Sequence, residues 1–342
     1  MVFRIFGAAA LIACACPTYA RPAATSQYRV SATIAGADGG WDYASVDTVR
    51  NRLYVARSDA IMVVDLATGT VTPHLAAATR AHQVLAIKDG REVIQTDGTG
   101  NLLRFVDADS GAVLAEVAVG KKPDAAILDP ATGAIVVANA GDGTLSLVDP
   151  ATRKVTSTIT IGGGLEYLAA DGRGTVWVNV EDSNELVAVD LKSGKVAARI
   201  ALTGCDAPSG LAFVAGGKRL ISACANNVAI VTDPVTHRIT ATLPIGKGPD
   251  AVKVDDARGL AFIPCGGDGI LEVISVANAD AIRVVARVKT AVSAKTAAVD
   301  PRTGNIYLPS ATLLPPAPGA KRGLPKPGSF AILVVSPVPS TR

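Results

Sequence analysis

Seven polar or charged residues stand at equivalent positions of an internal repeat, and together they could bind a ligand or move a proton. They open successive copies of the repeat and are Asp42, His82, Asp124, Glu166, Ser209, Asp250 and Lys295. Four carboxylates, an imidazole and an ammonium group can hold a cation, orient a polar ligand or transfer a proton. If the fold brings them to one cavity, they form the leading candidate for a site.

Candidate roles follow from the chemistry of each side chain. We assign general-base catalysis to His82 and Glu166, because both depart from the aspartate of other copies. Carboxylates suit a hard cation such as Ca²⁺ or Mg²⁺, and the candidate metal ligands are Asp42, Asp124, Glu166 and Asp250. The candidate ligand-binding residues are Asp42, Tyr43, Asp124, Asp250, Lys295 and Glu181.

Structural roles compete with these functional ones. Aspartates at repeat starts can bond backbone amides of the next unit, and Asp124 and Asp250 share a Pro-Asp-Ala setting that favours this role. Lys295 could serve only to neutralise two of the acids. His82 could be an ordinary hydrogen-bonded residue, and we expect Trp41, beside Asp42, to pack within the fold.

The repeat that carries these residues is built of strands. Its clearest copy, Pro123–Gly162, contains four short apolar or β-branched runs separated by Asp-Pro and Gly-rich turns. Pro presets φ and Gly accepts positive φ, so such turns end each run at strand length. Successive copies begin about 40 residues apart, a period typical of propellers. We therefore predict an all-β, seven-bladed β-propeller of four-stranded antiparallel blades.

The order of the strands predicts how the ring closes. Tyr28–Gly36 matches the fourth strand of other copies but precedes the first full copy, while the last copy ends with its third strand, Phe330–Val335. The N-terminal strand should therefore complete blade seven, which removes an open sheet edge. We expect residues 27–342 to form a single domain, although the length alone would suggest two.

In a propeller of this strand order, the repeat-start residues lie at the mouth of the central channel. The loops between second and third strands reach the same face and add Asp97, Asp142, Glu181 and Asp268. The Pro-rich segment Leu313–Pro327 interrupts blade seven on this face. We expect it either to extend over the mouth or to be a surface loop without a role.

Composition and motifs exclude several functions. The net charge is only +3, and no basic cluster with interleaved aromatic residues occurs, so nucleic acid is disfavoured as a partner. The sequence contains no HExxH, CxxCH or GxSxG motif, which removes support for a zincin, a c-type haem protein and a nucleophile-elbow hydrolase. With three histidines in all, a multi-histidine metal centre is not expected.

The N-terminus has the pattern of an export signal. Residues 1–20 combine Arg4 with an apolar core, Ile5–Ala13, that is too short to span a membrane, and Ala20 ends an acceptable cleavage site. Residues 21–26 would be a short linker. We expect a periplasmic or secreted protein; the alternative is an outer-membrane lipoprotein anchored through a lipid on Cys14.

Export would permit a disulfide. Cys205 precedes the first strand of blade five and Cys224 ends the second, so antiparallel pairing would bring them close enough to bond, with Cys265 left over. The alternative is three buried thiols.

Recurring segments resemble a known repeat family. They include Tyr54–Arg57 (YVAR), Val136–Asn139 (VVAN), Gly39–Tyr43 (GGWDY) and Gly204–Phe213 (GCDAPSGLAF). Together with the Asp-Pro-Ala-Thr-Gly turn, they resemble the YVTN-type β-propeller repeat family, and more narrowly an exported bacterial subgroup. The resemblance covers roughly residues 27–337 and implies the fold, but it implies no single reaction.

Two classes of function remain open. The first is an exported binding or scaffold protein, which we expect to be monomeric and to recognise a small molecule, a peptide or an envelope protein at the channel mouth. The second is a lactonase-like hydrolase or lyase that uses a carboxylate-held divalent metal, with His82 or Glu166 as general base.

Overall fold

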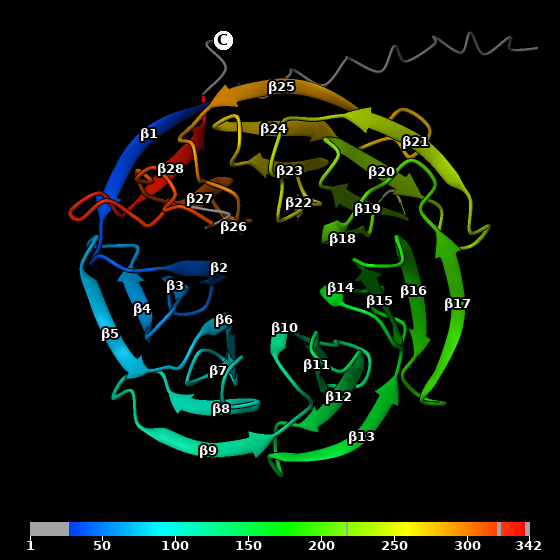
Figure 1. Ribbon diagram of the computed structural model, residues 1–342, viewed down its shortest axis with the longest axis horizontal. Helices are drawn as coiled ribbons and strands as arrows, with labels where there is room; N and C mark the ends of the chain where they lie inside the picture. The colour runs from blue at the N-terminus through cyan, green and yellow to red at the C-terminus, as the bar shows by residue number, and fades with distance from the viewer. Residues whose placement is uncertain (1–26, 217, 320–322, 339–342) are drawn as a thin grey trace, which may run out of the picture.

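The chain folds into seven four-stranded antiparallel sheets arranged as blades around a central channel (Figure 1). The computed structural model describes residues 27–216, 218–319 and 323–338. No α-helix occurs in these ranges, and the predicted all-β, seven-bladed propeller is confirmed. The predicted signal peptide (residues 1–20), the linker (21–26) and Cys14 lie outside the described residues.

Each blade runs from an inner strand at the channel to an outer strand at the rim. The inner strands are β2 (Trp41–Asp47), β6 (Ala81–Ile87), β10 (Pro123–Leu128), β14 (Leu165–Ala170), β18 (Pro208–Val214), β22 (Lys253–Asp255) and β26 (Ala298–Asp300). The second strands are β3 (Arg52–Arg57), β7 (Glu92–Asp97), β11 (Ile135–Asn139), β15 (Thr175–Val180), β19 (Arg219–Cys224), β23 (Leu260–Cys265) and β27 (Asn305–Ser310). The third strands are β4 (Ala60–Asp65), β8 (Leu102–Asp107), β12 (Thr144–Asp149), β16 (Glu185–Asp190), β20 (Val228–Thr232), β24 (Ile270–Ser275) and β28 (Ala331–Pro337). The outer strands are β5 (Val71–Ala77), β9 (Val113–Ala118), β13 (Lys154–Thr160), β17 (Lys195–Ala201), β21 (Ile239–Pro244), β25 (Arg283–Lys289) and β1 (Tyr28–Ala35).

Aspartates and glycines end the strands by the chemistry that the repeat predicts. In the turn between β10 and β11, the Asp129 carboxylate accepts a hydrogen bond from the Thr132 amide at 2.8 Å, and Gly133 has a φ of 73°. Asp65 caps the turn after β4 in the same way. Side-chain acceptors of this kind satisfy backbone amides that would otherwise be left unpaired, so each strand stops at a defined residue.

The ring closes through the two ends of the described chain. Strand β1 pairs antiparallel with β28, in a register that runs from Tyr28 opposite Pro337 to Ala35 opposite Ala331. The sheet order β1-β28-β27-β26 makes β1 the outer strand of blade seven. The predicted pairing of the N-terminal strand with Phe330–Val335 is therefore confirmed. Because β1 pairs with β28, the edge of β28 is not left open.

The core consists of apolar layers between adjacent blades. Among the described residues, seven clusters of buried side chains occur, each formed by two neighbouring sheets. Val, Ala, Ile and Leu dominate them, because β-branched and small side chains allow pleated sheets to stack closely. Tyr28 of β1 joins the cluster between blades six and seven, which ties the closing strand to the core.

A disulfide joins the first two strands of blade five. Cys205 and Cys224 are bonded, with their Cα atoms 5.4 Å apart, and Cys265 is a buried free thiol. The predicted pairing is confirmed. No helix in the described ranges is long and apolar enough to cross a membrane.

Candidate functional site

A β-bulge at the start of the inner strands aims the repeat-start residues at the channel mouth. In β2 the pairing jumps from Trp41 opposite Arg57 to Ala44 opposite Val55, which leaves one extra residue on the inner strand. The same shift occurs in β6, β10, β14 and β18. Bulges re-aim side chains and interrupt pairing. In blades one to five, the repeated bulge therefore presents one polar side chain per blade at the same end of the channel, while Asp250 and Lys295 precede the inner strands β22 and β26.

The mouth is centred on His82, which lies between two carboxylates from the neighbouring blades. Its Nδ1 lies 2.7 Å from Asp42 Oδ2 and 3.2 Å from Asp124 Oδ1. The His82 side chain is nearly buried, and its Nε2 is buried without a hydrogen-bond partner among the described residues. Blades one, two and three are thus linked through a single imidazole whose second nitrogen is left for another group.

The electrostatic surroundings favour a charged imidazole. Burial alone would lower the pKa of His82, but the hydrogen bond to Asp42 and the charges of Asp124 and Asp42 outweigh it, so the pKa of His82 is raised. A charged His82 donates a proton from Nδ1 and retains a second donor at Nε2.

Burial and mutual repulsion favour the protonated form of two mouth carboxyls. Burial, followed by the charge of Asp42, raises the pKa of Asp124 to about 6. Burial, followed by the charges of Asp124, Asp250 and Glu181, raises the pKa of Glu166 to about 9. At neutral pH Glu166 is therefore a proton donor, which differs from the general-base role that its sequence position suggested.

The opposite side of the mouth contains an ion pair. The Lys295 ammonium of blade seven bonds to Oδ2 of Asp250 in blade six. The charge of Asp250 raises the pKa values of both Asp124 and Glu166, so Asp250 interacts electrostatically with the other acids of the mouth. The structure thus brings together six of the seven repeat-start residues by contact or by charge, with Ser209 bonded through its hydroxyl to the backbone of Pro249 at 3.4 Å.

Tyr43 lies directly beneath this group of acids. It is fully buried, and burial followed by the charges of Asp250, Asp124, Asp42 and Glu166 raises its pKa well above the usual value. Its ring packs edge-on against Tyr167 at 4.8 Å between centroids. Tyr43 and Tyr167 thus form a floor under the mouth, and the ligand-binding role of Tyr43 stays a prediction.

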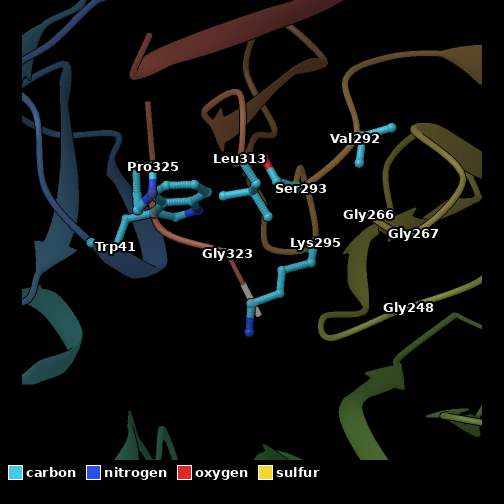
Figure 2. A pocket seen from close by; sticks show the side chains of 11 residues that line it. Trp41, Gly248, Gly266, Gly267, Val292, Ser293, Lys295, Leu313, Gly323 and Pro325 are labelled. Atoms are coloured by element: carbon cyan, nitrogen blue, oxygen red, sulfur yellow. The ribbon is translucent and has the colours of Figure 1, made fainter. Parts of the chain in front are cut away.

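A pocket of about 330 Å³ opens beside Lys295 on the mouth face. Figure 2 shows Trp41 and Leu313 on one side of it, with the loops of Gly248 and Gly266–Gly267 across from them. Pro325 and Gly323 complete its wall, so the described ends of the Pro-rich segment, which contain Leu313, Gly323 and Pro325, border this part of the mouth. The ends of that segment are held together by the Leu314 amide, which donates to the Leu324 carbonyl at 2.8 Å.

Trp41 has both of the roles that its position allows. Its ring packs against Phe330 at 5.4 Å between centroids, as expected for a residue between blades. It also lines the pocket, and its indole nitrogen is buried without a hydrogen-bond partner among the described residues.

Three of the four acids predicted from the second set of loops have structural roles. Asp142 accepts a hydrogen bond from the Lys121 amide at 2.8 Å, and Asp268 accepts one from the Lys247 amide at 2.9 Å. Asp97 is fully buried and binds Thr79 and Arg104. These residues clamp the links between blades, whereas Glu181 acts on the mouth through its charge on Glu166.

The four predicted metal ligands do not converge on a common point. Within the described ranges, no three His, Cys, Asp or Glu side chains are arranged to hold a metal ion. Asp42 and Asp124 both face His82, and Asp250 faces Lys295, so cationic side chains already occupy the positions that a metal would need. The residues present therefore do not fit a carboxylate-held Ca²⁺ or Mg²⁺ ion.

Sequence reasoning missed two residues that shape the channel. Gly98 leaves room for His82, since a Cβ at Gly98 would lie 2.8 Å from both Cδ2 and Nε2 of the imidazole. Lys253 donates a hydrogen bond to the Tyr167 hydroxyl at 2.7 Å, below the mouth. The repeat contained a signal for Lys253, because this charged residue stands in an inner strand where blade three has Ile127.

Comparison with known proteins supports the fold. No protein-family model and no curated protein matches the chain. Among solved structures, it is similar to hydrazine synthase of Kuenenia stuttgartiensis, with a TM-score of 0.70 and 15% sequence identity over 81% of this chain and 94% of that one. At this identity the similarity shows the β-propeller fold alone, and a fold does not by itself imply a function.

Proposed function

We propose that this chain is an exported binding protein that takes a small amine with an apolar portion at the channel mouth. The observation that carries the proposal is the excess of acids there. Five carboxyl groups, those of Asp42, Asp124, Glu166, Asp250 and Glu181, lie within the electrostatic reach of three cationic side chains, His82, Lys295 and Lys122. A half-buried acidic funnel attracts and holds cations more strongly than an exposed one, because the local dielectric is lower.

The pocket beside the funnel would hold the apolar portion of such a ligand. Trp41, Val292, Leu313 and Pro325 line it, and the free indole N–H of Trp41 can serve a polar substituent. An aromatic wall beside carboxylates is a suitable surface for an organic cation. The resemblance to exported YVTN-type repeats and the Cys205–Cys224 disulfide support export.

Calorimetry with phenethylamine tests the proposal. Because Glu166 is protonated at neutral pH, binding of an ammonium group should ionise it and release a proton. The heat of binding should therefore depend on the ionisation enthalpy of the buffer. This dependence should weaken in Glu166→Gln, and affinity should fall at least tenfold in Trp41→Ala, whereas His82→Ala, which removes a positive charge beside Asp42 and Asp124, should not weaken binding.

Glu116→Gln is the matched control, since Glu116 is an exposed carboxylate on the outer strand β9. The proposal fails if Trp41→Ala and Glu166→Gln bind like the parent, or if both unfold the protein. It also fails if benzoate, which has the opposite charge, binds the mouth as well as phenethylamine does.

One observation favours a hydrolase or lyase as the second candidate. The Asp42 carboxylate fixes His82 through Nδ1 and leaves Nε2 available, an arrangement that orients an imidazole for proton transfer. The raised pKa values of His82 and Glu166 would make them proton donors in such a reaction. Hydrolysis of a lactone panel that is lost in His82→Ala but retained in Glu116→Gln would establish this candidate.

A further inference from the structure

A second cavity occupies the channel on the far side of the Tyr43–Tyr167 floor. This far chamber has a volume of about 430 Å³, within the range of small-molecule sites. Its walls come from the inner strands and are mainly apolar, with Val46, Leu85, Ile127 and Val299 among them. Strand β2 runs from Asp42 at the mouth to Val46, a rise of about 13 Å at the usual spacing of strand residues.

The far chamber opens away from the mouth. Leu128 lines it at the end of β10 and is 41% exposed, whereas Ala126 on the same strand is buried. A ligand would therefore enter from the face opposite the acids and move toward the floor.

Polar groups are concentrated at the floor end of this chamber. Lys253 projects there and is the one charged residue among the described residues that line the chamber. Its ammonium donates to the Tyr167 hydroxyl and lies 4.2 Å from the centre of the Tyr167 ring and 5.8 Å from that of Tyr43. An ammonium has three donors, so two remain for another acceptor.

Gln83 supplies an independent sign of a missing ligand. It lines the same chamber, is only 2% exposed, and its Oε1 is buried without a hydrogen-bond partner among the described residues. Its Nε2 makes only a long contact of 3.4 Å with the Val84 carbonyl. Because buried amide groups rarely stay unsatisfied, Gln83 is poised to bond a polar group in the chamber. Toward an acceptor such as a carboxylate its donor is the weakly bonded Nε2, since Oε1 only accepts.

We propose that the far chamber is a binding site for an apolar carboxylate, such as a medium-chain fatty acid or a comparable monocarboxylate. The carboxylate bonds to the Lys253 ammonium, and the Tyr167 hydroxyl and the Gln83 Nε2, which also line the chamber, are further donors. The apolar tail lies along Val46, Leu85 and Ile127 toward the open end. Charge complementarity selects the class, since a lone ammonium at the end of an apolar tunnel matches one anionic group on an apolar chain.

Isothermal titration of the protein with sodium octanoate tests the site. Octanoate should bind saturably in the micromolar to millimolar range, and octanol and octylamine should bind at least tenfold more weakly. Lys253→Met keeps the length of the side chain but removes its charge. It should lower the affinity for octanoate at least tenfold. Lys192→Met is the matched control on an exposed lysine and should bind as the parent does.

A second variant covers the case in which Lys253→Met does not fold. Ala86→Phe places a ring in the chamber from a half-buried wall position and should block octanoate while Lys253 stays intact. The proposal is overturned if octanoate does not saturate in the millimolar range, if either folded chamber variant binds like the parent, or if octanol binds as tightly as octanoate. Octanoate binding that persists in Glu166→Gln separates this chamber from the mouth, so each site can fail alone.

Discussion

The two ends of the central channel are built from the same seven inner strands, yet they have opposite chemical character. The mouth gathers Asp42, Asp124, Glu166 and Asp250 around His82 and Lys295. The far chamber is apolar apart from a few groups led by Lys253. In five of the seven inner strands, a β-bulge near the repeat-start residue interrupts the regular alternation at the mouth, so the side chains at the two ends can differ without altering the pairing that holds the blades.

Removing the floor between the two ends should have the largest effect. Tyr43 is fully buried and packs on Tyr167, so Tyr43→Ala should lower the free energy of unfolding by about 3–5 kcal/mol. It should also join the mouth to the chamber and erase the difference in ligand preference between them. Urea denaturation measures the first effect, and titration with phenethylamine and octanoate the second. Tyr43→Phe keeps the ring and should preserve both preferences.

Loss of the disulfide should destabilise the mouth end of the channel more than the far chamber. Cys205 and Cys224 are 19 residues apart, and closing a loop of that length stabilises a protein by about 3 kcal/mol. The double variant Cys205→Ala/Cys224→Ala should lose about that much on chemical denaturation, with octanoate binding retained. Alkylation of a form cleaved after Ala20 without reductant should modify Cys265 alone; three modified cysteines would contradict the bond.

Crowding of His82 should perturb ligand binding at the mouth alone, and it should lower the free energy of unfolding by less than the two changes above. A methyl group at Gly98 would lie 2.8 Å from the imidazole, and such overpacking costs about 1–3 kcal/mol. Gly98→Ala should therefore weaken the binding of phenethylamine but leave the binding of octanoate unchanged. Gly164→Ala is the matched control near the mouth, where the nearest atoms to an added Cβ lie 4.0 Å away. If both variants behave alike in titrations, the position of His82 does not control the mouth.

Per pH unit, the change in stability that the mouth carboxyls cause should be the smallest of these effects. The pKa of Glu166 is about 9 in the fold against 4.5 in the unfolded chain, so the fold keeps a proton that the unfolded chain releases. Stability therefore falls as pH rises between those values. Asp124 acts in the same direction between 3.8 and about 6. The raised pKa of His82 also acts in this direction, because its contribution is lost as pH rises through the folded value.

Glu166→Gln should make this decline shallower, by at most about 1.4 kcal/mol per pH unit, the effect of a single proton. Denaturation curves across the interval between the two pKa values of Glu166 measure the slope. Glu116→Gln should leave it unchanged, and an unchanged slope in Glu166→Gln would contradict the protonation of this carboxyl at neutral pH.

The sequence was sufficient to predict the residues of the mouth but not those of the far chamber, and the reason is physical. The repeat-start residues recur in phase, so their shared position followed from the period alone. The partners of His82 did not follow, because the bulge decides which neighbouring acids an inner side chain meets. For the same reason, Asp97 and Asp142 could not be recognised as clamps. The chamber depends on Lys253 and Gln83, which each occur in one blade only, so their signal is a departure from the repeat and not a recurrence within it.

The pairing of β1 with β28 also sets the order in which the molecule can form. Tyr28 finds its partner at Pro337, near the opposite end of the chain, so blade seven cannot be completed before the other six have been synthesised. Contacts this distant in sequence make folding slow. Until they form, β1 and the growing array present unpaired edges that could recruit another chain. A chain shortened before β28 would keep six complete blades but leave β1 without its partner, and we expect it to associate with other chains through the exposed edges.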